Sequence, residues 1–320
     1  ATILNRVLYC TQQMDNYANQ LVGKISGAVG AYNAQVGLGF SERCAPTKTE
    51  MDRLHAANWP TETFENRVLA KLGLLAAPIS TQILPPEPLA FFLWSCCMLS
   101  AALAQLGRDG RNLMRTEIGE IAEAFEAEQV GSSTMAHKHN PLFFENTEGQ
   151  WIRNKNEYGK VEDTLISEHQ RDLVGSCVMR DFPIILVNLQ YQLNTLRRKT
   201  DDGTPFLRRV TVNPEACQAN FERSAHVILA EPLYIALQMA GYESDAHELI
   251  LRTLVPRAQA NKRLLIEELE LHAANDEEVH QALERIPGDI YDLFRHAERY
   301  TGNANAKALQ IAEAAEAFAS

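Results

Sequence analysis

The sequence predicts an all-α fold, a long-helix bundle followed by a small helical C-terminal domain. Apolar residues recur at three- and four-residue steps over long stretches, whereas the alternating pattern typical of β-strands is scarce. The composition is that of a globular protein, with 46% apolar and 22% charged residues. A chain of 320 residues suggests about two domains. We therefore expect helices packed around a sizeable apolar core.

Two of the predicted helices cover Thr2–Val22 and the stretch Leu89–Leu106. The second pattern can be followed as far as Phe125, and about 40 unbroken residues would form a rod about 60 Å long. Such a rod is too long for a compact globule and suits a bundle. Polar residues interrupt Leu89–Leu106, and a membrane helix needs roughly 18 apolar residues, so we expect no membrane segment.

The predicted domain boundary lies after a charged turn. A helical pattern over Phe182–Leu196 is followed by the sequence KTDDGTP at Lys199–Pro205, and a new helix is expected to start at Asn213-Pro214. We therefore expect a central helical bundle domain over residues 1–210 and a C-terminal helical domain over residues 211–320.

Charge and cysteine content exclude several classes of protein. The net charge is −11, which disfavours general binding to nucleic acid or to anionic membranes. The six cysteines show no CxxC pair or regular spacing, so neither a disulfide framework nor a zinc site is indicated. The chain opens without the pattern of a secretory signal. We expect a cytoplasmic protein that needs no metal or other cofactor.

The most informative string is GSSTMAHKHNP, at residues 131–141. It follows an acidic helical stretch and precedes another helical run, so we expect an exposed loop that offers hydroxyls, a cation, imidazoles and an amide. By themselves these residues leave open a simple polar connector. A metal site through His137 and His139 is disfavoured, because Lys138 between them would repel a cation.

This string resembles the signature loop GSSxMPxKxNP of the fumarase/aspartase superfamily, with Ala136 in place of the proline. Four other segments are similar to those of adenylosuccinate lyases, most closely of the bacterial type, and follow in the same order. They are GKISGAVG at residues 23–30, HQRDLVGS with Arg180 at residues 169–180, LAEP at residues 229–232 and RYTGNA at residues 299–304.

The resemblance implies a β-elimination that cleaves adenylosuccinate into AMP and fumarate, together with the matching step on the succinylcarboxamide ribotide in purine biosynthesis. A base removes a proton next to a carboxylate, an acid protonates the departing nitrogen, and cationic and N–H donors stabilise the carbanion. It also implies a homotetramer whose active sites are each assembled from three subunits. The expected partners are thus a purine nucleotide and further copies of the chain.

The resemblance assigns roles to individual residues. Ser132 matches the catalytic base, and Glu145 matches the carboxylate that orients the acid histidine. The remaining matches are substrate-binding residues: Lys138 and Asn140 for the fumarate-side carboxylates, Arg171, Ser176 and Arg180 for the phosphate, and Gln82, Ser133 and Met135.

The sequence departs from the family in one large respect. It contains neither of the two other signature regions, one of which carries the acid histidine, and we expect that the N-terminal domain of the family is missing from it. The chain alone should therefore show little or no activity. Three alternatives stay open: a non-catalytic assembly protein, a truncated inactive fragment, and a sister lyase such as argininosuccinate lyase.

Overall fold

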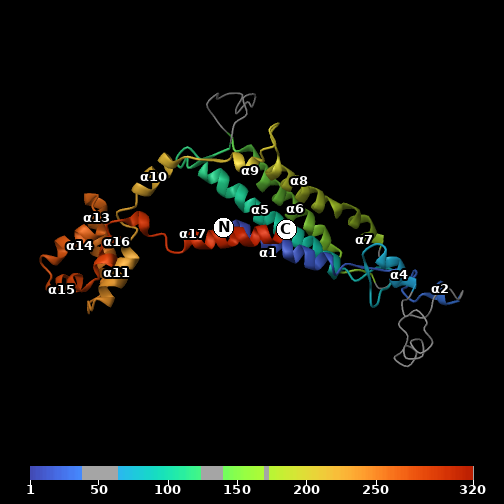
Figure 1. Cartoon of the computed structure of the whole chain (residues 1–320). Coiled ribbons are helices and arrows are strands. Elements are labelled where there is room, and N and C mark those ends of the chain that lie inside the picture. The colour runs from blue at the N-terminus through green and yellow to red at the C-terminus, as the bar shows by residue number, and fades with distance from the viewer. Residues whose placement is uncertain (38–63, 124–139, 169–172, 320) are drawn as a thin grey trace. The chain divides into compact units, whose positions relative to one another are not determined.

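The computed structural model describes residues 1–37, 64–123, 140–168 and 173–319 (Figure 1). It divides into two compact units. The bundle unit comprises residues 2–112, 123–210 and 315–320, and the C-terminal unit comprises residues 113–122 and 211–314 together with Ala1. A division thus falls between Val210 and Thr211, and the grouping of residues 113–122 with the C-terminal segment is a feature that periodicity alone did not suggest.

The fold is all-α, as the sequence predicts. Among the described residues the strands are two residues long each: β1 (Val22–Gly23) pairs in parallel with β2 (Leu75–Ala76), and β3 (Ile121–Ala122) pairs antiparallel with β4 (Thr211–Val212). Each strand pair joins segments far apart in the sequence, and neither forms a layer of its own.

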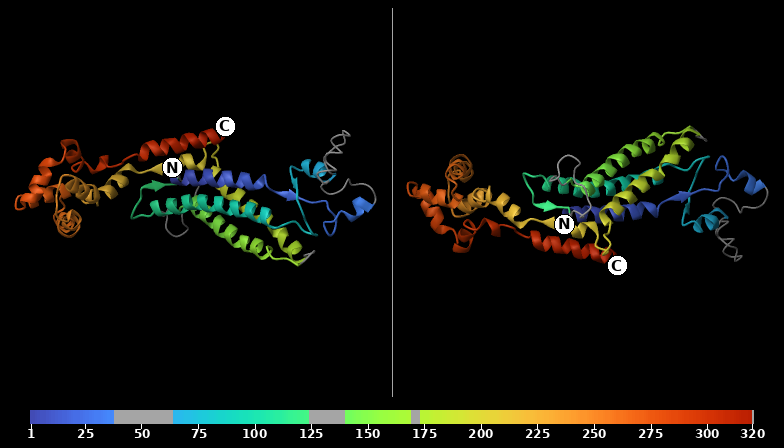
Figure 2. Two further views of the ribbon diagram at one scale, coloured as in Figure 1. Left: turned by 90° about the horizontal axis from the view of Figure 1, so that it is seen from below. Right: turned by 90° about the horizontal axis from the view of Figure 1, so that it is seen from above.

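Long helices form the bundle unit, with α5, α6 and α8 side by side (Figures 1 and 2). The side chain of Gln192 on α8 ties them together, because its Nε2 donates to the carbonyl oxygens of Ser100 on α5 (3.0 Å) and Thr147 on α6 (2.7 Å). The elements of this unit are α1 (Thr2–Ala18), α2 (Asn33–Gly37), α4 (Phe64–Ala70), α5 (Glu87–Leu113), α6 (Leu142–Asp163), α7 (Leu173–Val178), the 3-10 turn Met179–Asp181, α8 (Pro183–Arg197) and α9 (Phe206–Arg209).

Helices α5 and α6 are antiparallel and approach each other closely. A Cβ atom at Gly110 would lie 2.6 Å from ring atoms of Phe144, and one at Gly107 would lie 2.6 Å from the Phe144 carbonyl oxygen. Near the other end of the pair, the Tyr158 hydroxyl donates to the carbonyl oxygen of Ala90 at 3.3 Å. The end of α5 therefore lies against the start of α6, and only glycine fits at the closest contacts.

The apolar pattern that can be followed as far as Phe125 is not one unbroken helix, because α5 ends at Leu113. The chain turns back there: the amide of Glu120 donates to the Leu113 carbonyl oxygen (3.0 Å), and Gly119 adopts a positive φ of 62°. Glycine accepts this left-handed conformation at little cost, which explains why the apolar pattern does not continue as helix.

The expectation about membrane helices also needs correction. Helix α5 is long and apolar enough to cross a membrane, judged by length and composition alone. In the structure, however, 56% of its most apolar window is buried inside the protein. Such burial is typical of a core helix in a bundle. A core helix can also be long and apolar enough to meet the criteria for a membrane span.

The C-terminal unit has its own apolar core, built largely from leucine, isoleucine and alanine side chains such as Leu233, Ile250 and Leu269. Asn213 caps its first helix by accepting the amide of Ala216 at 3.2 Å, as the predicted helix start implies. The helices are α10 (Pro214–Glu222), α11 (Ala230–Met239), α12 (Ala246–Glu248), the π-helical turn Leu249–Leu254, α13 (Val255–Asn261), α14 (Leu265–Ala273), α15 (Glu277–Arg285), α16 (Gly288–Leu293), the 3-10 turn Ala297–Arg299 and α17 (Ala304–Ala319), whose last residues are grouped with the bundle unit.

Candidate active site

Two predicted site residues flank the start of α6. Asn140 is half-buried, and its carbonyl oxygen accepts the amide of Leu142 at 2.9 Å. Glu145 lies in the first turn, where its amide donates to the Pro141 carbonyl oxygen at 2.8 Å and its side chain is exposed. The side-chain amide of Asn140 and the carboxylate of Glu145 are thus both placed by the first turn of α6 and the two residues that precede it.

A carboxylate from a distant part of the chain binds the same turn. Glu123 is only 5% exposed, and its two oxygens accept the amides of Phe144 (2.9 Å) and Phe143 (3.3 Å). Burial raises the pKa of the Glu123 carboxyl above its ordinary value of 4.5 and the nearby charge of Glu145 adds to this, while the backbone amides oppose it.

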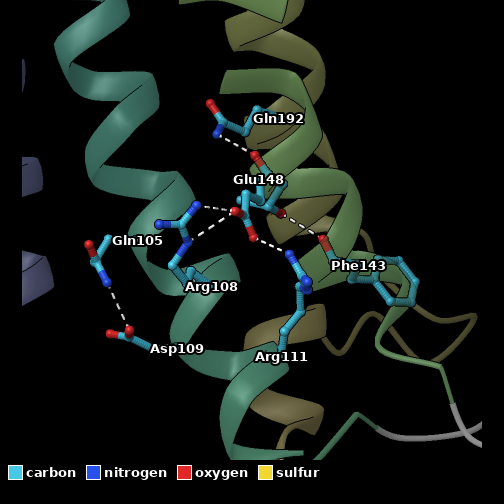
Figure 3. A network of polar contacts seen from close by, with 8 residues as sticks. Gln105, Arg108, Asp109, Arg111, Phe143, Glu148 and Gln192 are labelled. Atoms are coloured by element: carbon cyan, nitrogen blue, oxygen red, sulfur yellow. Dashed lines mark hydrogen bonds and ion pairs between the residues drawn. The ribbon is translucent and has the colours of Figure 1, made fainter. Parts of the chain in front are cut away.

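One turn further along α6, Glu148 forms a second buried acidic group (Figure 3). Arg108 on α5 donates to it from Nε (3.0 Å) and Nη2 (2.6 Å), and Arg111 donates to its other oxygen. Burial alone would raise the pKa of the Glu148 carboxyl, but the hydrogen bonds from both guanidinium groups outweigh it and the pKa is lowered. A cavity of about 140 Å³ adjoins this cluster, and its lining includes Arg6, Gln105 and Trp151 beside Arg108 and Glu148.

A different group of predicted residues lies beyond the other end of α6. Arg180 and Ser176 are exposed, and Asp181 beside Arg180 accepts a hydrogen bond from Lys160, near the end of α6, at 2.8 Å. The side chain of Lys160 is bonded to Glu157 as well, at 2.6 Å. The predicted phosphate-binding residues that the structure describes are therefore held next to the C-terminal turn of α6.

Gln82 belongs to this second group. It precedes α5, whose Ala90 lies against Tyr158 near the end of α6. The ammonium group of Lys24 donates to the carbonyl oxygens of Gln82 (3.0 Å) and Gly27 (2.7 Å), so that the GKISGAVG segment is joined to the segment of Gln82.

Further contacts fix these two segments against each other. The hydroxyls of Ser26 and Ser80 are 2.8 Å apart, and Gly30, at a positive φ of 73°, lets Ser80 approach so closely that a Cβ would lie 1.9 Å from its carbonyl oxygen. Glu65 is buried and accepts the Ile25 amide at 2.6 Å. The loop is thus held by backbone and side-chain bonds rather than by apolar packing alone.

The structure therefore brings the predicted residues into two groups and does not bring the groups together. A helix of 22 residues is about 33 Å long, so Asn140 and Glu145 are separated from Gln82, Ser176 and Arg180 by the full length of α6. The other residues predicted for the site, Ser132, Ser133, Met135, Lys138 and Arg171, lie outside the described residues, as do Ala136, His137 and His139.

The metal-ligating side chains and the buried cysteines of the described residues also bear on the chemistry of these groups. Among the described residues, no three His, Cys, Asp or Glu side chains come together to hold a metal ion. Cys96 and Cys97 lie in the core of α5, where burial raises the pKa of Cys96 to about 11 and that of Cys97 to about 12. Their thiols behave as small apolar groups, as the sequence predicts.

Comparison with known proteins agrees with the motifs. Residues 53–153 match a family model described as Lyase. An adenylosuccinate lyase from Pyrococcus horikoshii is 33% identical over 250 residues, which are 77% of this chain and 48% of that relative. Over these residues the chain is similar to the adenylosuccinate lyases. It spans about half the length of the curated relatives that it matches.

Solved structures show the same fold. The 3-carboxy-cis,cis-muconate lactonizing enzyme from Pseudomonas putida matches with a TM-score of 0.69 at 21% identity, over 100% of this chain and 63% of that one. A fumarate lyase from Mesorhizobium sp. BNC1 matches with a TM-score of 0.67 at 18% identity, over 97% and 61% of the two chains. The long-helix bundle predicted from the apolar periodicity is thus confirmed.

Sequence reasoning missed several residues that shape the two groups. Lys24 lies within a string that was noticed, but only the structure shows that it binds the Gln82 carbonyl oxygen. Glu65 and Glu123 gave no signal, because each acts on backbone amides that are distant in the sequence. Glu148 lies one turn beyond Glu145, but its arginine partners on α5 could not be inferred from the spacing alone.

Proposed function

We propose that the protein is an adenylosuccinate lyase, which releases fumarate from adenylosuccinate and from the succinylcarboxamide ribotide in purine biosynthesis. The observation that carries this proposal is the similarity to adenylosuccinate lyases over 77% of the chain, with the signature strings in the same order. The activity is a C–N bond cleavage by β-elimination.

In the proposed mechanism Ser132 removes the proton next to a substrate carboxylate, after which negative charge spreads onto that carboxylate. Lys138 and Asn140 offer the donors that stabilise this charge, which is the term that usually contributes most to such catalysis. Glu145 orients the acid histidine that protonates the departing nitrogen. Because this histidine has no match in the chain, it would come from a region outside this sequence.

The proposed phosphate-binding residues favour a nucleotide substrate over the substrates of sister lyases. Arg171, Ser176 and Arg180 form the proposed phosphate set, in which guanidinium groups can bind phosphate oxygens in a bidentate manner. Argininosuccinate carries no phosphate, so a site of this kind has no purpose in an argininosuccinate lyase. Gln82, Ser133 and Met135 complete the proposed substrate contacts.

We further propose that sites are shared between subunits of a homotetramer. The 33 Å that separate the two groups, about the length of α6, are far more than one nucleotide spans, so a second copy must supply the opposite end of its own bundle. An apolar face on α5 supports such assembly: Phe91, Trp94 and Met98 follow at helical spacing and are 51%, 45% and 41% exposed.

The proposal includes a cytoplasmic location and two domains, at residues 1–210 and 211–320. The free state of the described cysteines, at positions 10, 96, 97, 177 and 217, supports a reducing compartment.

The test is complementation in a mixed assembly. The 320-residue chain is refolded together with the Pyrococcus horikoshii relative whose loop serine has been replaced by alanine, and fumarate release from adenylosuccinate is measured. Each protein alone should be nearly inactive, since loss of an acid or base typically costs about 10² to 10⁴-fold, and the mixture should recover activity. The matched control is the chain with Ser132→Ala, which should recover none.

Other outcomes identify the alternatives. A mixed oligomer, verified by mass, that releases no fumarate would support a non-catalytic assembly protein. Release of fumarate from argininosuccinate but not from adenylosuccinate would support a sister lyase.

A further inference from the structure

The first turn of α6 is capped by a side chain that does not come from its own vicinity. Pro141 stands at the cap position, and no side-chain cap hydrogen bond is formed there. The first amides of a helix have no partner within the helix and need an acceptor when they are buried. Glu123 supplies it from 21 residues away, bonding the Phe144 and Phe143 amides.

Electrostatics also favours an acceptor with negative charge at this position. The N-terminus of a helix carries a partial positive charge, and a carboxylate bonded to backbone amides there is among the stronger hydrogen-bond arrangements in proteins. Glu123 is 5% exposed, so solvent competes little for these bonds. The contact therefore fixes the position of the first turn of α6.

The bonded amides lie between the two described residues of the proposed site. Asn140 comes three residues before Phe143, and Glu145 comes directly after Phe144. Both depend on the same backbone, since the Asn140 carbonyl oxygen accepts the Leu142 amide and the Glu145 amide is bonded within the first turn. A change in the attachment of this turn would rotate or shift both side chains.

Taking the proposed function as its basis, we infer that Glu123 is a positioning residue for the lyase reaction: its side chain holds the first turn of α6 so that Asn140 and Glu145 face the substrate and the acid. Glu123 acts through the backbone of this turn and does not touch the substrate. The negative charge of the neighbouring Glu145 contributes to the raised pKa of Glu123.

The test compares Glu123→Ala with Glu123→Gln in the 320-residue chain. Glu123→Ala removes both acceptors, so the Phe143 and Phe144 amides should exchange with solvent about tenfold faster or more, and the backbone signals of Asn140 and Glu145 should shift. Glu123→Gln keeps one acceptor oxygen and should retain most of the protection. The control is Glu117→Gln, because the Glu117 side chain is 72% exposed and lies outside this turn.

In the complementation assay, Glu123→Ala should lower kcat about tenfold or more and change KM much less, and Glu123→Gln should restore most of the rate. Unchanged exchange would overturn the inference, and so would faster exchange with unchanged kcat, which would indicate a purely structural cap. If the mixed assembly that contains the unmodified chain shows no turnover, the proposed function fails. In that case the backbone signals of Asn140 and Glu145 in Glu123→Ala test the positioning role, which is overturned if these signals do not shift.

If Glu123→Ala does not fold, Glu123→Asp replaces it. The side chain of aspartate is one methylene group shorter, which withdraws its carboxylate from both amides. The same exchange and kcat results as for Glu123→Ala are therefore expected in a folded protein, and the same results would overturn the inference.

Discussion

The two ends of α6 are built in different ways. At its start, carboxylates dominate: Glu123 and Glu148 are buried, one bonded to backbone amides and the other to two arginines. At its other end, Lys160 is bonded to Glu157 and Asp181 beside the segment of Arg180, and Lys24 is bonded to the backbone of the Gln82 segment. The difference teaches that the two groups of predicted site residues lie in unlike surroundings at opposite ends of one helix.

This division agrees with helix electrostatics. The partial positive charge at the start of α6 favours carboxylates there, and the partial negative charge at its end favours cations. Interventions at one end should leave the other end intact, which makes the comparison open to experiment.

The largest expected effect on stability is at the start of α6. Gly110→Ala would place a Cβ 2.6 Å from the Phe144 ring, so the ring or the helix must move, at a cost of about 1–3 kcal/mol. The matched control is Gly149→Ala on α6, where a Cβ meets nothing within 4 Å and helix propensity should favour alanine. Urea unfolding measures both, and a Gly110→Ala variant as stable as the unmodified chain would break the account of this contact.

A slightly smaller effect is expected from Glu148→Gln, which weakens the bonds from Arg108 and Arg111 and should cost about 1–2 kcal/mol at neutral pH. The pKa of Glu148 is lowered in the folded protein, so its stabilisation is present above the ordinary value of 4.5 and is lost as the pH falls below it. The gap between the two proteins should therefore narrow in acid. Thermal unfolding across this pH range checks it, and a constant gap would contradict the ion-pair account.

The smallest effect should come from the opposite end. Lys24→Met removes two hydrogen bonds to carbonyl oxygens at a position accessible to solvent, so we expect a loss of about 0.5–1 kcal/mol. Lys71→Met, at another exposed position, serves as the control and should change little. A loss as large as that of Gly110→Ala would mean that the two ends of α6 are not so different.

Local signals in the sequence were enough for the fold and indicated candidate site residues, but not how these residues are arranged in space. The start of α10 at Asn213-Pro214 was predictable, because the cap and its partner amide are three residues apart. The end of α5 at Leu113 was not, since the apolar pattern continues while the backbone turns at Gly119. Periodicity reports which residues are apolar and does not report where the chain reverses.

The site illustrates the same limit. The strings around Asn140 and Arg180 identified the residue types, yet their separation by the length of α6 follows only from helix packing. The role of Glu123 depends on a contact across 21 residues and that of Glu148 on arginines 37 and 40 residues away, which no local pattern encodes. Tertiary contacts thus decided what sequence reasoning left open.

The central claim is that the two ends of α6 serve different active sites. The most direct measurement introduces Asn140→Ala or Arg180→Ala into the chain before it is co-assembled with the loop-serine variant of the Pyrococcus horikoshii relative. The recovered site uses the start of this chain's α6 and the opposite end from another copy. Fumarate release should therefore be lost with Asn140→Ala and kept with Arg180→Ala. Equal loss with both variants would show that one chain supplies both groups to one site, and would contradict the account.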